Sequence, residues 1–96
     1  MSSFTISSDH PALPGHFPGQ PVVPGVVLLD AVREALASEM PGQRIAGILY
    51  VKFMQPLLPD QVCTLNIDHG QSRCRFRIES GDRLVAQGEL ALEAAE

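Results

Sequence analysis

The feature that most constrains this chain is a proline-rich stretch that runs directly into an apolar helical segment. Residues 9–24 contain five of the eight prolines, and proline is excluded from helix interiors and central strands, so this stretch must be a loop. Residues 24–40 then show helical spacing and begin with a proline suited to a first turn. Because residues 26–29 are apolar on all sides, we expect a buried helix. A long irregular loop in a small domain typically serves a functional site.

Strand patterns account for most of the remaining chain. A short strand candidate precedes the loop and four longer ones follow the helix: residues 4–7, 44–55, Val62–His69, Arg73–Ser80 and 83–92. One helix and a largely antiparallel sheet define an α+β domain, and a length of 96 residues predicts that residues 1–96 form a single one. In the last hairpin, we expect a three-residue loop at residues 80–82, with Leu84 opposite Ile78.

The two cysteines, Cys63 and Cys74, fall on the apolar side of neighbouring predicted strands. A turn at residues 70–71 would place Cys74 opposite Ile67 and so leave the two cysteines four residue steps, or about 13 Å, apart. A disulfide cannot span that distance. We therefore expect two reduced core thiols, and the absence of histidines at ligand spacing argues against a metal site.

Charge and hydropathy narrow the class of partner. Seven basic against 11 acidic residues give a net charge of -4, the wrong sign for a protein held to nucleic acid by phosphate neutralisation. No run approaches the roughly 18 apolar residues of a membrane span, and the amino terminus lacks a basic region followed by an apolar one. We expect a soluble, cytoplasmic protein that binds neither nucleic acid nor membrane.

Candidate chemistry is concentrated between His16 and Asp30. The start of a buried helix leaves backbone amides unpaired at its positive end, so the amide of Gly25 or Val26 is suited to polarise a carbonyl group. Gly25 has no side chain to block such an approach. A histidine that takes a proton and a carboxylate that donates one, beside that amide, are the parts needed for proton removal next to a thioester carbonyl and loss of a β-hydroxyl.

Simpler interpretations of the same residues stay open. Asp30 shares helical spacing with Arg33 and Glu34 and is also expected if it begins a solvated helix face. His16 alone is also consistent with a loop histidine bonded to backbone. A basic strip fits either the solvated side of a sheet or a landing patch for an acidic partner; its members are Lys52, Arg73, Arg75 and Arg77.

The run GHFPGQPVVPGVVLLDA, residues 15–31, resembles the signature of the 3-hydroxyacyl-(acyl-carrier-protein) dehydratases of the FabA/FabZ type. Downstream, VKFMQPLLPD, residues 51–60, is similar to that family's long second strand and the loop after it, so the resemblance covers roughly residues 4–92. It implies the hot-dog fold, an antiparallel sheet of about five strands wrapped around one central helix. It also implies a homodimer, or a multiple of one, in which the strand at residues 44–55 pairs with its twin.

The resemblance also assigns roles to individual residues. His16 matches the catalytic histidine and Asp30 the catalytic acidic residue, and the two would come from different chains. Gly25, with Val26 beside it, matches the helix start whose amide binds the thioester oxygen. The substrate channel implied in the same way contains Phe17, Pro24 and Leu29.

The activity that the resemblance implies is dehydration of a 3-hydroxyacyl thioester, carried on acyl carrier protein or CoA, to the trans-2-enoyl product. The pathway would be fatty-acid synthesis or a related secondary lipid, polyketide or pigment pathway, with no metal or organic cofactor. The loop resembles the FabZ branch, whereas aspartate at position 30 is typical of the FabA branch, which leaves isomerase activity open. A hot-dog thioesterase with a carboxylate on the same helix and a non-catalytic acyl-binding protein are the alternatives.

Overall fold

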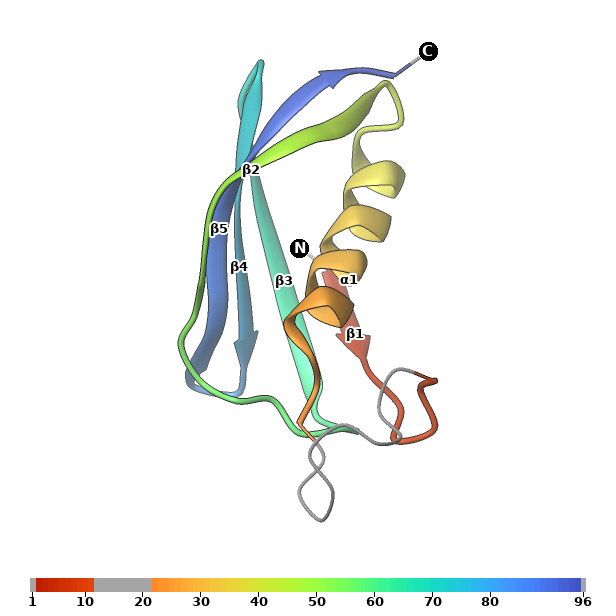
Figure 1. Ribbon diagram of the computed structural model, residues 1–96, viewed down its shortest axis with the longest axis vertical. Coiled ribbons are helices and arrows are strands. Elements are labelled where there is room, and N and C mark those ends of the chain that lie inside the picture. Colours follow the sequence, from red (N-terminus) through yellow and green to blue (C-terminus); the bar gives the residue numbers. More distant parts are fainter. Residues whose placement is uncertain (1, 12–21, 96) are drawn as a thin grey trace.

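The computed structural model describes residues 2–11 and 22–95 as a five-stranded sheet with one helix (Figure 1). The elements are β1 (Ser2–Thr5), α1 (Gly25–Glu39), β2 (Gln43–Phe53), β3 (Val62–His69), β4 (Arg73–Ser80) and β5 (Arg83–Ala94). β3 and β4 have the predicted limits and β5 has the predicted start, and the other limits of the strands and the helix differ from the predictions by one or two residues. The predicted α+β hot-dog architecture is confirmed.

The sheet is antiparallel throughout, in the order β1-β3-β4-β5-β2. Its two edges are therefore β1 and β2, and among the described strands β2 pairs with β5 alone. Helix α1 lies along one face of the sheet (Figure 1). This topology leaves the long strand β2 as an edge beside the helix.

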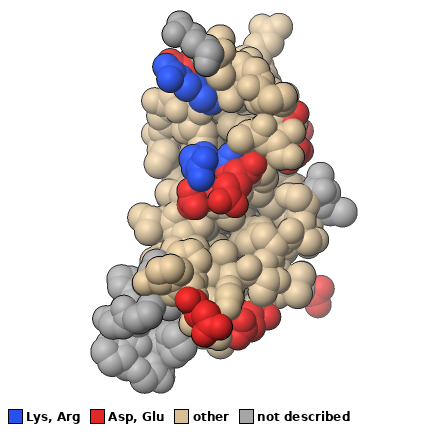
Figure 2. All heavy atoms as spheres, turned by 90° about the vertical axis from the view of Figure 1, so that its right-hand side faces the viewer, with Lys and Arg blue, Asp and Glu red and all other residues tan. Residues whose placement is uncertain are grey.

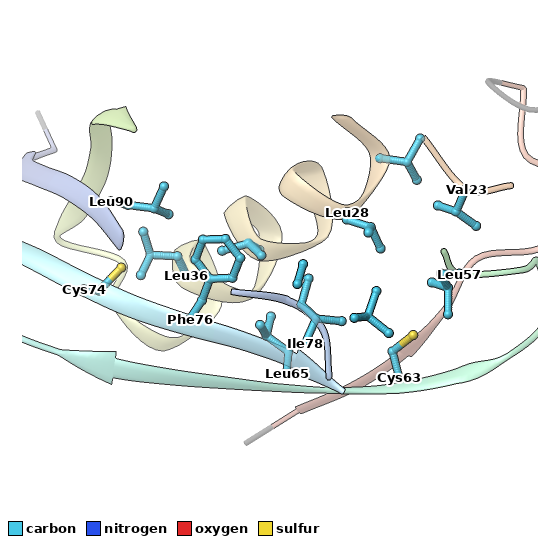
Figure 3. Packing of buried hydrophobic residues seen from close by; sticks show 14 of the residues in the cluster. Val23, Leu28, Leu36, Leu57, Cys63, Leu65, Cys74, Phe76, Ile78 and Leu90 are labelled. Atoms are coloured by element: carbon cyan, nitrogen blue, oxygen red, sulfur yellow. The ribbon is translucent and has the colours of Figure 1, made fainter. Parts of the chain in front are cut away.

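Helix α1 contributes one face to the core and leaves the other face open. Val27, Leu28, Val32 and Leu36 are buried against the sheet, whose inward residues come from β3, β4 and β5 (Figure 3). Val26, however, is 72% exposed. The expectation that the first turns are buried on all sides is therefore wrong for the single chain, because one sheet covers only one side of the helix. No helix in the described ranges is long and apolar enough to cross a membrane.

The β3–β4 hairpin differs from its expected register by two residues. Ile67 pairs with Phe76, not with Cys74, because the Gly70 amide donates to the Arg73 carbonyl at 2.8 Å and moves the turn to residues 71–72. A shift of two residues keeps every apolar side chain on the same face of the sheet. The alternating pattern therefore cannot distinguish the two registers.

The β4–β5 hairpin also departs from expectation. Its turn has two residues, 81–82, with Gly81 at φ 61°, a left-handed conformation that glycine adopts without strain. Between Glu79 and Ile78 the register then shifts by one residue, so that Ile78 pairs with Ala86 and not with Leu84. The shift compensates for the shorter turn and returns the apolar residues of β5 to the core face.

Both cysteines are buried and free, as predicted. In the observed register Cys74 pairs with His69, which lies six residues along β3 from Cys63. The two thiols lie in different parts of the core (Figure 3). Burial raises the pKa of both thiols.

Candidate active site

The start of helix α1 has no side-chain cap. Pro24 is the N-cap residue, with φ -63° and ψ 147°, and its carbonyl accepts from the amides of Val27 at 3.0 Å and Leu28 at 3.4 Å. The amides of Gly25 and Val26 precede these donors and have no carbonyl four residues earlier within the helix. They lie at the positive end of the helix dipole and are suited to hold a negatively charged oxygen.

Phe53, the last residue of β2, lies over Gly25. A Cβ atom added to Gly25 would lie 2.6 Å from Cζ of Phe53 and 3.0 and 3.1 Å from its two Cε atoms. Such distances are shorter than carbon contacts allow, so any larger residue at position 25 displaces the ring. Glycine leaves the ring in place and also leaves the amide accessible.

An apolar cavity of about 560 Å³ adjoins the helix start. This volume lies within the range of small-molecule sites. Its lining comes from the segment that enters the helix, the first turn of the helix and the end of β2: Val22, Val23, Pro24, Gly25, Val26, Leu28, Phe53, Met54, Gln55, Pro56 and Leu57. Of the predicted channel residues, Pro24 lines the cavity, whereas Leu29 packs against the core cluster.

Asp30 lies on the open side of the helix in the single chain. The Nε atom of Arg33 donates to its Oδ1 at 2.9 Å, and Nη2 forms an ion pair with the same oxygen at 2.9 Å. Glu34 lies 3.9 Å from the same guanidinium group. The side chains of Asp30 and Arg33 are 56% and 58% exposed, and Asp30 does not line the cavity. Figure 2 shows the helix side of the molecule as largely uncharged, with a cluster of both signs near its middle.

The histidine of the predicted acid–base pair, His16, lies outside the described residues, as does the predicted channel residue Phe17. The described ends of their loop are both held by the connection between β2 and β3. The Asp60 amide donates to the Ile6 carbonyl and the Val23 amide donates to the Leu57 carbonyl, both at 2.8 Å. The loop therefore leaves and rejoins the described structure at the end of the sheet where the helix starts (Figure 1).

The predicted basic strip occupies the sheet face away from the helix. Its arginines alternate along β4 with buried residues, and carboxylates of the same chain lie close to each of them. Glu89 accepts from Arg73 at 3.0 Å and lies 3.7 Å from Arg75, and Glu79 lies 3.5 Å from Arg77. Two carboxylates thus lie against the four cations of the strip, which is partly neutralised.

Two residues of consequence were not identified from the sequence. Glu89 is a buried carboxylate, 7% exposed, on the outer face of β5, and nothing in its local pattern distinguishes it from a solvated strand residue. Phe53 is the last residue of β2, and its close approach to Gly25 joins two distant segments of the chain, which no local sequence pattern reports. Lys52 pairs with Gln87 in the β2–β5 register, on the same face as the arginines.

Comparison with known proteins shows the family to which the chain belongs. The model of the ApeI-like family, described as ApeI dehydratase, matches residues 1–89. The chain belongs to this family of hot-dog dehydratases. It is also 35% identical over 98 residues to the 3-hydroxyacyl-(acyl-carrier-protein) dehydratase FabZ of Haemophilus influenzae, covering 93% of this chain and 66% of that protein. The FabZ of Thermomicrobium roseum is 32% identical, with 92% and 64% covered. The chain thus spans slightly less than two thirds of these relatives.

Solved structures agree with this assignment. The dehydratase heterocomplex ApeI:P from Xenorhabdus doucetiae contains a chain that is 30% identical, with a TM-score of 0.84 over 94% of this chain and 82% of that one. An uncharacterised protein from Erwinia carotovora subsp. atroseptica is 31% identical, with a TM-score of 0.81 over 96% and 80%. The fluoroacetyl-CoA thioesterase FlK, at 15% identity, TM-score 0.64 and 98% and 87% coverage, shares the fold alone.

Proposed function

We propose that this protein dehydrates a 3-hydroxyacyl thioester to the trans-2-enoyl thioester, in fatty-acid synthesis or a related lipid, polyketide or pigment pathway. The observation that carries the proposal is the uncapped start of α1, where the amides of Gly25 and Val26 adjoin an apolar cavity. Membership of the ApeI-like family supports the same reaction. The resemblance of residues 15–31, which include the GHFPG run and Asp30, to the dehydratase signature also supports it.

In the proposed reaction, His16 removes a proton from C2 of the substrate. The electrons of that bond move toward the thioester carbonyl, and the developing oxyanion is held by the Gly25 amide, with Val26 beside it. Asp30 orients or protonates the hydroxyl on C3, which leaves as water while the C2–C3 double bond forms. Since the thioester itself acidifies C2, the scheme needs no metal or organic cofactor.

We propose further that the acyl group arrives on acyl carrier protein, with CoA as the alternative carrier. The names of the FabZ relatives support the carrier protein. The strip formed by Lys52, Arg73, Arg75 and Arg77 is the candidate docking surface for such an acidic partner. Because two carboxylates of this chain already offset part of the positive charge of the strip, we expect a weak contact that added salt weakens further.

The proposed active unit is a cytoplasmic homodimer, or a multiple of one, built on the edge strand β2. Ile48, Leu49 and Tyr50 on this strand are 56%, 50% and 43% exposed, a run of apolar surface that favours coverage by a second chain. Pairing of the two β2 edges would cover the open side of α1 and supply His16 and Asp30 to one site from different chains. A heterologous partner, as in the ApeI:P complex, is the competing outcome.

The decisive experiment measures two reactions and ligand binding with one purified protein. Reversible hydration of an enoyl thioester, seen as loss of the conjugated enoyl ultraviolet absorbance, supports the dehydratase. Release of free thiol from an acyl thioester would instead identify a thioesterase. Binding of the acyl thioester without either product would identify an acyl-binding protein and overturn the proposal.

A further inference from the structure

We infer that Phe53 is the residue that limits the length of the acyl chain that this site accepts. The inference rests on the proposed function, because it assigns the cavity at the start of α1 to the acyl chain of the thioester. It concerns the selectivity of the site and not the chemical step.

Phe53 lies beside both the candidate oxyanion donor and the apolar cavity. Its ring contacts Gly25, whose amide is the candidate oxyanion donor, and the same ring lines the apolar cavity. Its backbone is fixed by pairing with Ala86 at the end of β2. A substrate whose thioester oxygen reaches the Gly25 amide would therefore have its acyl chain beside this ring in the cavity.

The residues that line the cavity divide into buried core residues and exposed residues. Val23, Leu28 and Leu57 are 4%, 3% and 1% exposed and belong to the core, so trimming them damages the fold. Phe53 is 53% exposed and Met54 is 48% exposed. Phe53 is thus a large side chain in the cavity wall whose reduction changes the space available to a ligand with little loss of core packing.

The contact between Phe53 and Gly25 predicts that a substitution at Gly25 also changes the cavity. A methyl group at position 25 would lie 2.6 Å from Cζ of Phe53, and the half-exposed ring can yield only by moving away from the helix start. Gly25→Ala should therefore alter the cavity through Phe53. With the smaller side chain of Phe53→Leu, that part of the effect should disappear.

The first test measures kcat/KM for a graded series of 3-hydroxyacyl thioesters with wild type, Phe53→Leu and Phe53→Ala. Each methylene buried in an apolar site is worth up to about fourfold in affinity. We expect both variants to raise the ratio of long-chain to short-chain kcat/KM by about tenfold or more, since room for several methylenes is opened. Val62→Ala is the matched control, because Val62 is 64% exposed and does not line the cavity. An unchanged ratio in a folded Phe53→Leu variant overturns the inference.

A binding measurement keeps this test independent of the proposed chemistry. Non-reactive thioether analogues with a short and a long acyl chain are titrated into the same proteins by calorimetry, and the ratio of the two Kd values should shift in favour of the long chain. If the wild type turns over no thioester but the ratio of Kd values still shifts, the proposed function is wrong and the role of Phe53 stands. If the ratio stays fixed while wild type is active, the role of Phe53 is wrong and the dehydratase stands.

The coupling of Gly25 and Phe53 is measured by a double-mutant cycle in thermal unfolding. Gly25→Ala should lower Tm in the wild-type background and lower it less in the Phe53→Leu background. Equal losses in both backgrounds would show that the ring does not restrict position 25, and would remove the physical basis of the inference.

Discussion

Arg33 lies three residues after Asp30 on α1, and its guanidinium group holds one carboxylate oxygen, Oδ1: Nε donates to it at 2.9 Å and Nη2 forms an ion pair with it at 2.9 Å. An ion pair this exposed contributes at most about 1 kcal/mol to stability. The contact also restricts the direction in which the carboxylate points, because one of its oxygens is held. In the proposed dimer this pair would lie where the second chain covers the helix, so the role of Asp30 is the first matter to test.

Asp30→Asn should fold normally, still bind an acyl thioester, and lose most of its turnover. Asparagine keeps the size of the side chain but cannot transfer a proton, and general acid–base groups contribute roughly 10²–10⁴-fold in rate. Asp30→Glu should keep part of the activity, since the FabZ branch that the chain resembles has glutamate at this position. Steady-state rates and thermal unfolding of both variants provide the measurement.

The matched control for Asp30 is Glu34→Gln, which alters a carboxylate of the same exposed helix face outside the proposed machinery. We expect it to change kcat by less than about twofold, as for surface substitutions in general. If Asp30→Asn also turned over at the wild-type rate, Asp30 would be a solvated residue of that face and its proposed role in the reaction would be wrong.

His16→Ala should abolish dehydration and leave thermal stability nearly unchanged. A histidine in a proline-rich loop contributes little to the core, whereas loss of the general base costs roughly 10²–10⁴-fold in rate. His10→Ala, which changes the histidine at the described start of the same loop, is the matched control. A folded His16→Ala protein that retained more than about a tenth of wild-type activity would exclude this residue as the base.

The limits of the strands and the helix could be predicted because local sequence patterns determine them. β3 and β4 alternate strictly, which sets their limits, and Pro24 fixes the start of the helix. The hairpin registers were predicted incorrectly, since alternation is satisfied equally by a shift of two residues and a turn can be shortened when a register shift compensates.

The candidate site was predictable only where its residues belong to a continuous motif. Gly25 and Asp30 belong to the motif at residues 15–31. Phe53 approaches Gly25 from a strand far along the chain, and no local sequence pattern predicts a contact of that kind. The exposure of Val26 was missed for a different reason, whereas the exposure of Asp30 agrees with the solvated helix face that the sequence left open. A helix that is apolar on all sides predicts burial, but the sheet of one chain covers only one side of it.

Ile48→Lys should convert the protein to monomers and abolish activity. Ile48 is 56% exposed on the edge strand β2, and a charge there opposes pairing of two apolar edges, a common device against edge association. Light scattering of the eluted protein and the hydration assay report the two effects. Val62→Lys places the same charge on another exposed position, on β3, and should change neither. A monomeric wild type with full activity would contradict both the β2 pairing and the shared site.

Glu89→Ala should lower the free energy of unfolding by about 1–3 kcal/mol, the cost of losing a charge-assisted hydrogen bond to a nearly buried group. Glu89 is 7% exposed and bonds Arg73 at 3.0 Å, with Arg75 at 3.7 Å. Glu93→Ala removes a more exposed carboxylate, paired with Arg44 at 2.6 Å, and should cost less than about 1 kcal/mol. Urea unfolding curves compare the two. Equal losses would mean that burial of Glu89 adds nothing to its ion pairs.

Cys63 and Cys74 should resist thiol reagents at neutral pH in the folded protein and react promptly in urea. Burial raises the pKa of both thiols above the ordinary value of 9.0; at Cys74 a hydrogen bond with the Leu90 backbone opposes this effect and the charge of Glu89 adds to it.

The thiolate is the reactive form, so a raised pKa and burial act together to slow labelling. Because the folded pKa lies above the unfolded one, unfolding releases protons at high pH. The stability linked to these thiols is therefore intact below about pH 9 and declines as pH rises through the folded pKa values. Mass spectrometry of labelled protein should count no modified cysteine when folded and two in urea. Rapid single labelling of the folded chain would show that one thiol lies outside the core.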